Sequence, residues 1–224
     1  MDLTPILISM RTATVAILIT FFLGLFAAKL VTGLRNQVIR SVIDGLLILP
    51  LVLPPTVAGF FLLYLFGVHR PIGKFLIDFF GIRVAFSWGA TVLAAVVISF
   101  PLMYRSAKGA FELVDSNLIY AARTLGMSEW KIFWRVMMPT AMPGVVSGGI
   151  LAFARGLGEF GATAMIAGNI AGKTRTVPMA IYSAVVAGDM ETAGSYVLFI
   201  TILAVMIITS MNYFTTHRYF TARR

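Results

Sequence analysis

The sequence contains no cysteine and only two histidines, His69 and His217, among its 224 residues. Without cysteine there is no disulfide framework, no thiolate metal ligand and no cysteine nucleophile. Two histidines far apart in the sequence are too few ligands for a haem or zinc centre. The sequence therefore predicts no metal site and no cofactor bound by this chain.

Charged residues are also scarce. They make up 12% of the chain, whereas 59% of the residues are hydrophobic and the mean hydropathy is +0.91. A soluble domain of this length needs more polar residues to cover its surface, so the chain is predicted to be an integral membrane protein. The chain has a net charge of +9. Basic residues of membrane proteins usually collect in their cytoplasmic loops, so this charge needs no nucleic-acid partner and none is expected.

Five segments are long and apolar enough to cross the hydrocarbon core, which takes roughly 20 helical residues. The apolar segment 177–188 is too short to cross and is predicted to form an external re-entrant or interfacial helix. The expected fold is one all-α integral membrane domain over residues 1–224 with about five transmembrane helices. The predicted spans are 13–34, 45–66, 85–104, 144–168 and 194–214.

Lysine and arginine are distributed unequally between the two sides of this arrangement. Loops 29–44 and 105–143 and the carboxyl-terminal tail hold eleven of them, and the opposite side holds six. The richer side is predicted to be cytoplasmic. The amino terminus and residues 169–193 are then outside, and the carboxyl terminus is in the cytoplasm.

The longest cytoplasmic loop, residues 105–143, contains an amphipathic stretch. Ser128 stands where a side chain could cap a helix. Such a helix either lies flat at the lipid interface or docks onto a partner protein, and both interpretations stay open. Its large apolar residues would share one stripe: Trp130, Phe133, Trp134 and Met137.

This loop resembles the cytoplasmic loop of the membrane subunits of binding-protein-dependent ABC importers. That family has E-A-A, three residues, G, nine residues and I-x-L-P. The matching positions here are Ala121, Ala122, Gly126, Val136, Met138 and Pro139, with Tyr120 in place of the family's Glu. Gly126 permits a left-handed turn between two helices, and Pro139 is expected to end the second helix.

The resemblance implies that this loop is a coupling segment, seated in a groove of a cytoplasmic ATPase. The residues assigned to coupling are Ala121, Ala122, Gly126, Ser128, Glu129 and Pro139. The implied assembly is a homodimer with two ABC ATPase subunits and an external oxyanion-binding protein, in the cytoplasmic (inner) membrane of a bacterium or archaeon. ATP and Mg²⁺ would be bound by the ATPase, so this chain would not be an enzyme.

Four other stretches resemble a molybdate-type permease of this superfamily. They are LPLVLPPTVAG at 49–59, ARTLG at 122–126, ARGLGEFGAT at 154–163 and KTRTVPMAIY at 173–182. Sulfate permeases share a run like LGEFGA, so that stretch does not separate the two oxyanions. The resemblance implies molybdate as the substrate, with sulfate or tungstate as the alternative.

The second predicted span contains Pro50, Pro54 and Pro55. Interior prolines remove backbone hydrogen bonds and kink helices. In a membrane, broken helix is tolerated where it is buried in protein or lines a wet cavity. Pro54, Pro55 and the adjacent Thr56 are therefore candidates for the pathway or its gate, and a bent packing helix is the alternative.

The fourth predicted span carries Arg155 and Glu159, one helical turn apart. An isolated arginine at mid-helix costs about 2.5–3.5 kcal/mol, so the two charges are expected to pair. Either they face the pathway or its gate, or they form a structural ion pair in the cytoplasmic half of the bundle. Gly144 and Gly148 in this span predict close packing against another helix.

The run IAGNIAGKTRT at residues 166–176 is similar to a phosphate-binding loop. That motif needs G-x-x-x-x-G-K-[ST] between a strand and a helix, but Ala167 occupies the first glycine position. The run is therefore not a nucleotide site. Lys173 and Arg175 are external candidates for contact with a binding protein or an arriving anion, and a solvated basic loop is the alternative.

Two hypotheses come from other functional classes. An intramembrane enzyme would need an activated nucleophile, but Ser99 and Ser147 have no histidine in any predicted span to act as base. A passive channel would not need an amphipathic cytoplasmic element.

Overall fold

A computed structural model of the chain describes residues 2–221, with side chains up to Ser210. Every regular element in this range is helical. Four helices are long and apolar enough to cross a membrane, or five if the bent pair α2–α3 is one span, which confirms the predicted fold class. In chain order the elements are α1 (Thr4–Thr32), α2 (Gln37–Val52), α3 (Pro55–Phe66), α4 (Pro71–Phe80), α5 (Trp88–Glu112), α6 (Ser116–Thr124), α7 (Glu129–Ile132), the π-helix η1 (Phe133–Met137), α8 (Met138–Leu157), α9 (Gly161–Ile166), α10 (Val177–Val186) and α11 (Met190–Thr221).

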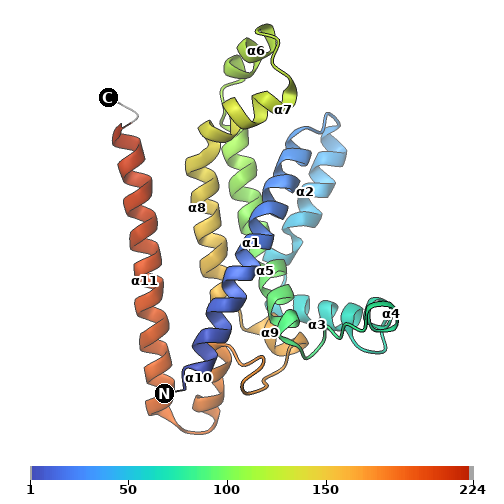
Figure 1. Cartoon of the computed structure of the whole chain (residues 1–224), viewed down its shortest axis with the longest axis vertical. Coiled ribbons are helices and arrows are strands. Elements are labelled where there is room, and N and C mark those ends of the chain that lie inside the picture. Colours follow the sequence, from blue (N-terminus) through green and yellow to red (C-terminus); the bar gives the residue numbers. More distant parts are fainter. Residues whose placement is uncertain (1, 222–224) are drawn as a thin grey trace.

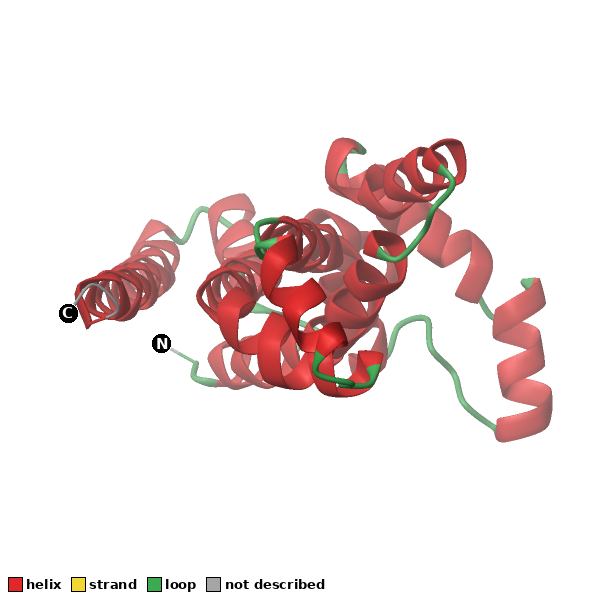
Figure 2. Cartoon of the chain, turned by 90° about the horizontal axis from the view of Figure 1, so that it is seen from above, coloured by secondary structure: helices red, strands yellow, loops and turns green. Residues whose placement is uncertain are grey.

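The centre of the molecule is built from α1, α5 and α8, which lie side by side (Figures 1 and 2). Two hydroxyl pairs join α1 to α5. Thr12 lies 3.0 Å from Thr91, and Thr20 lies 3.2 Å from Ser99, measured between side-chain oxygens. Such pairs satisfy polar groups between helices that share an apolar surrounding.

Helices α5 and α8 approach each other through small residues. A Cβ added to Gly148 would lie 2.4 Å from the Cβ of Ser106, and one added to Gly144 would lie 2.7 Å from that of Ala110. Neither distance leaves room for a side chain, so the predicted close packing at these glycines is confirmed.

The predicted second span, 45–66, is not one helix. Helix α2 ends at Val52, α3 begins at Pro55, and the two are bent by 108°. Leu53 is extended, as expected for a residue before proline, and Pro54 and Pro55 offer no backbone N–H to continue the ladder. Pro50 lies inside α2 without ending it. The prolines therefore turn the chain sideways, which is more than the predicted kink.

Pro139 does not end a helix, contrary to the prediction. Helix α7, η1 and α8 form a continuous stretch of 29 residues from Glu129 to Leu157. The wider turn of η1 ends at Met137, two residues before Pro139, and lets the helix continue past the proline. The predicted fourth span is also too long at its other end, because α8 stops before Gly158 and α9 is a separate short helix.

Other boundaries shift outward. Helix α1 begins at Thr4, α5 continues to Glu112 and α11 begins at Met190, so the loop predicted at 105–143 is shorter than expected. The predicted short helix at 177–188 is confirmed as α10, with ten residues. Its first backbone N–H, on Val177, donates to the hydroxyl of Ser9 in α1 at 2.7 Å.

Candidate functional site

The coupling element predicted from the sequence is a pair of short helices, α6 and α7, at one end of the molecule (Figure 1). Gly126 separates them with a φ of 75°, a left-handed conformation that glycine adopts without strain. The N–H of Met127 donates to the carbonyl of Ala122 at 3.1 Å, and that of Gly126 to Arg123 at 2.9 Å. These two bonds are the Schellman motif that ends a helix, so the predicted turn at Gly126 is confirmed.

Large apolar side chains on this element are not covered by the rest of the protein. Leu125 is 81% exposed and Trp130 is 70% exposed, while Ala121 is exposed and Ala122 is buried. The predicted single stripe is wrong, because Phe133 and Met137 are buried while Trp130 and Trp134 are exposed. The tryptophans therefore form part of an uncovered surface.

An ion pair closes the turn between the two helices. The Arg123 Nε atom donates to Glu129 at 2.7 Å, and its Nη2 atom donates to the same carboxylate at 3.2 Å. This hydrogen bond and the carboxylate charge raise the pKa of the Arg123 guanidinium. Ser128 precedes α7 as predicted, but its side chain makes no capping hydrogen bond, so that part of the prediction is wrong.

Buried residues attach the coupling element to the bundle. The Phe133 ring packs edge-on against Phe111 of α5, with centroids 5.7 Å apart. The Lys29 ammonium of α1 lies 4.9 Å from the centre of the same Phe133 ring. The coupling element is therefore joined to the bundle through η1, which contacts α1 and α5 at Phe133 and continues into α8.

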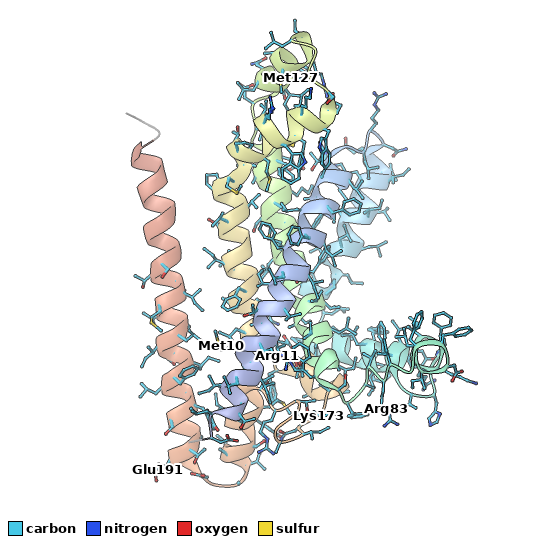
Figure 3. All side chains as sticks on the ribbon, in the orientation of Figure 1. Met10, Arg11, Arg83, Met127, Lys173 and Glu191 are labelled. Carbon is cyan, nitrogen blue, oxygen red and sulfur yellow. The ribbon has the colours of Figure 1, made fainter. Side chains whose placement is uncertain are left out.

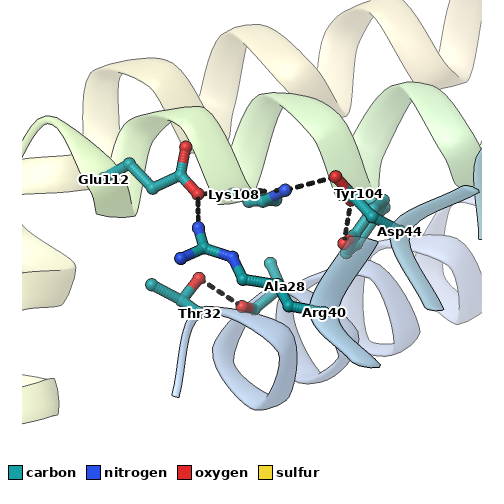
Figure 4. A network of polar contacts seen from close by, with 7 residues as sticks. All are labelled: Ala28, Thr32, Arg40, Asp44, Tyr104, Lys108 and Glu112. Carbon is teal, nitrogen blue, oxygen red and sulfur yellow. Dashed lines mark hydrogen bonds and ion pairs between the residues drawn. The ribbon is translucent and has the colours of Figure 1, made fainter. Parts of the chain in front are cut away.

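A polar network between α2 and α5 is absent from the sequence-based prediction (Figure 4). The Tyr104 hydroxyl and the Lys108 ammonium each donate to the Asp44 carboxylate at 2.5 Å. Arg40 forms an ion pair with Glu112, whose carboxylate lies 3.9 Å from Lys108. Two features of the sequence could have indicated this network. Asp44 is a single acidic residue in an apolar helix, and Lys108 and Glu112 are four residues apart.

Arg155 and Glu159 form the predicted pair. The Arg155 Nη1 atom donates to Glu159 Oε2 at 2.8 Å, and the N–H of Ala162 donates to Oε1 at 2.8 Å. Glu159 is 2% exposed, whereas the Arg155 side chain is 31% exposed. The pair stands where α8 ends, away from α6 and α7, and its predicted place in the cytoplasmic half stays a prediction.

The pathway candidates near the prolines lie against the same region. A Cβ added to Gly161, at the start of α9, would lie 3.0 Å from Pro55 Cβ and 3.2 Å from the Thr56 backbone nitrogen. The structure thus brings the start of α3 next to the α8–α9 break that Glu159 holds. Pro54 and Thr56 are exposed, and a role of these residues in a gate stays a prediction.

The glycine-rich run 166–176 folds as a turn after α9, at the end of the molecule opposite Met127 (Figure 3). The Thr174 hydroxyl accepts from Ile170 N–H at 3.0 Å and donates to the Gly168 carbonyl at 3.2 Å. Lys173 is exposed, and Arg175 donates to Asn169 at 2.8 Å. The binding role predicted for Lys173 and Arg175 stays a prediction.

Residues 20–223 match the family described as binding-protein-dependent transport system inner membrane component. The molybdenum transport system permease protein ModB of Escherichia coli (strain K12) is 43% identical over 202 residues, or 90% of this chain and 88% of that protein. ModB of Mycobacterium tuberculosis (strain ATCC 25618 / H37Rv) is 40% identical over 209 residues, or 93% of this chain and 78% of that protein.

Solved structures share the fold at low identity. An inward-facing MetNI methionine ABC transporter chain has a TM-score of 0.72 with 16% identity, covering 95% of this chain and 94% of that one. A chain from a bacterial ABC transporter that imports the acidic polysaccharide alginate has a TM-score of 0.74 with 14% identity, covering 96% and 79%. Because the family match and the sequence relatives extend over most of its length, the chain belongs to the family of binding-protein-dependent transport system inner membrane components.

Proposed function

We propose that the chain is the pore-forming permease subunit of an ATP-driven importer and that its substrate is molybdate. The observation that carries the proposal is the 40–43% identity to molybdenum transport permeases over most of this chain. Sulfate and tungstate are the alternative substrates. In this scheme an external binding protein selects the anion, and the permease provides a path without a tight site of its own.

The proposed assembly contains two copies of this chain, two cytoplasmic ATPase subunits and one external binding protein. Five spans are too few to enclose a path with a gate at each end, and a two-fold pair is the simplest closed arrangement. ATP and Mg²⁺ belong to the ATPase subunits, so this chain binds no cofactor. The assembly lies in the cytoplasmic membrane, with α6 and α7 inside and the amino terminus outside.

Coupling is proposed to run along one continuous helix. Leu125 and Trp130 are apolar side chains that an ATPase groove can cover. The 29-residue helical stretch from Glu129 to Leu157 connects that contact, through η1, to the far end of α8. There Glu159 binds the start of α9, which packs on α3, so a tilt imposed at α7 reaches the candidate gate.

Uptake by the reconstituted assembly tests the proposal. Liposomes that contain the chain with its ATPase and binding protein should accumulate radiolabelled molybdate only with ATP on the ATPase side. Excess unlabelled molybdate should compete, and sulfate at the same excess should not. Equal competition by sulfate or tungstate would reassign the substrate, and uptake without ATP would overturn the importer itself.

The intramembrane enzyme receives no support from the serines that it would need. Ser99 donates to the Ala95 carbonyl at 2.6 Å and lies beside Thr20. No group of three or more His, Cys, Asp or Glu residues able to hold a metal ion occurs in the part of the chain that the structure describes.

A further inference from the structure

Helix α4 lies outside the bundle, as an arm continued from α3. Figure 1 shows α3 and α4 leaving the bundle sideways, and α4 is the helix at the right edge of Figure 2. The arm is packed firmly at its base. A Cβ added to Gly73 would lie 2.1 Å from the Gly67 carbonyl oxygen and 2.5 Å from that of Phe66. Because this contact admits no side chain, α4 has a defined position on the end of α3.

Apolar and charged side chains lie on different sides of α4. At about 100° per residue, Ile72, Phe75 and Phe79 share one side of the helix, and Lys74 and Asp78 lie on the flank beyond Phe75, roughly 140° and 100° from Phe79. The apolar face is open, with Phe79 73% exposed and Phe75 51% exposed. The two rings contact each other, with centroids 4.7 Å apart and ring planes tilted by 36°. This is a continuous aromatic surface that water would not cover favourably.

Basic residues surround this aromatic surface. Lys74 lies on the charged flank of α4, Arg70 immediately precedes the helix, and Arg83 follows it by three residues. The Arg70 guanidinium lies 4.2 Å from the centre of the Tyr64 ring. Exposed aromatic residues next to exposed cations are typical of helices that lie in the headgroup region of a bilayer and attract anionic lipids.

The position of the arm along the length of the bundle also places it at the headgroup region of a bilayer. Helix α2 begins beside the α1–α2 loop, at the α6–α7 side of the molecule (Figure 1). Its 16 residues rise roughly 24 Å, close to the hydrocarbon thickness of about 30 Å. The 108° bend then turns α3 aside, so the arm lies across the bundle near the opposite edge of the hydrocarbon core.

We propose that α4 is an interfacial helix in the leaflet opposite α6 and α7, and that it binds anionic phospholipid. Phe75 and Phe79 lie among the acyl chains, and Lys74 and Arg83 contact the headgroups. The arm thereby fixes the sideways course of α3, whose start packs on Gly161 near the α8–α9 break. This role is independent of which anion the chain transports, so failure of either proposal leaves the other intact.

Depth measurements on a spin label test the insertion. The chain has no cysteine, so Phe79→Cys and Asp78→Cys each give a single labelling site in the full chain. The matched pair is reconstituted in vesicles of phosphatidylcholine and phosphatidylglycerol. The label at 79 should collide mainly with oxygen, which partitions into acyl chains. The label at 78, on the charged flank roughly 100° around the helix, should collide mainly with a water-soluble nickel chelate.

Two results would overturn the insertion, and a third measurement would identify a covering protein. Nickel collisions at 79 equal to those at 78 would mean that the face is in water. Protection of the label at 79 from both reagents would mean that protein covers it. Dipolar broadening that disappears on dilution with unlabelled chain would identify that protein as a second copy.

The headgroup contact has its own test. Adding Lys74→Gln and Arg83→Gln to the Phe79→Cys chain should move the label towards water in vesicles with phosphatidylglycerol. In the Phe79→Cys chain that keeps Lys74 and Arg83, the label should move towards water by the same amount when phosphatidylglycerol is left out of the vesicles. An unchanged depth in both experiments would overturn the anionic-lipid contact, and unchanged circular dichroism would show that the variants remain folded.

Discussion

Arg155 donates to the carboxylate of Glu159 at 2.8 Å, across the point where α8 ends. The carboxylate is almost fully buried, and its second oxygen accepts the N–H of Ala162 at the start of α9. One side chain thus neutralises a charge and joins two helices. The geometry explains how a carboxylate can stand beside a proposed anion path, because its charge is already paired.

Glu159→Gln should therefore lower the free energy of unfolding by about 1–3 kcal/mol. The amide can still accept from Ala162, but it leaves Arg155 without its charge partner. The loss should fall below the roughly 3–5 kcal/mol of a fully buried pair, since Arg155 is partly exposed. Unfolding by sodium dodecyl sulfate measures the change, and exposed Glu191→Gln is the control. Equal stability of the two variants would contradict a structural pair.

Gly126→Ala should reduce transport more than it reduces stability. An L-residue in the left-handed conformation of Gly126 costs roughly 1 kcal/mol and tilts α7 against α6. The number of molybdate ions imported per ATP hydrolysed should fall. Gly194→Ala is the matched control, because no atom lies within 4 Å of the added Cβ. A normal transport ratio in Gly126→Ala would count against the coupling role of this turn.

Tyr104→Phe should destabilise the protein by about 1 kcal/mol, because it removes one donor to Asp44 and leaves Lys108 in place. Asp44→Asn should cost more, since it removes the charge that faces Lys108. The order of the two losses, measured by the same unfolding titration, checks the network. An equal or reversed order would show that the ion pair contributes less than the hydroxyl bond.

Gly148→Ala should cost about 1–3 kcal/mol, because the new methyl group would overlap Ser106. Ser106→Gly in the same chain should restore most of the loss by removing the opposing Cβ. Thermal unfolding of the single and double variants gives the coupling between the positions. Additive losses would indicate that α5 and α8 are not in contact at this level.

The helical membrane fold and the turn at Gly126 could be predicted because each depends on local signals. Apolar length defines a span, and a glycine at the end of a helix supplies the left-handed residue. The effects of Pro54 and Pro139 could not be separated by sequence alone, although both are prolines in apolar surroundings. Pro54 is followed by a second proline, and helix α2 ends just before them. Pro139 follows the π-helix η1, whose Phe133 and Met137 are buried, and this local geometry cannot be read from the sequence.

The candidate site was partly predictable for the same reason. Arg155 and Glu159 are four residues apart on one segment, so their pairing follows from helical geometry. Asp44 and Lys108 are 64 residues apart and meet only because α2 packs on α5. The amphipathic pattern of the coupling element also did not show which aromatic residues the bundle would cover.

The bond from Val177 to Ser9 has a consequence for biosynthesis. Its two ends are 168 residues apart, so α1 has been in the membrane for most of translation before α10 emerges. Helix α10 is too short to cross the membrane by itself, and its first N–H needs a partner away from water. Its insertion is therefore a late step that depends on an already placed first helix. If α1 were displaced, α10 would lack this partner and would be exposed to quality-control proteases.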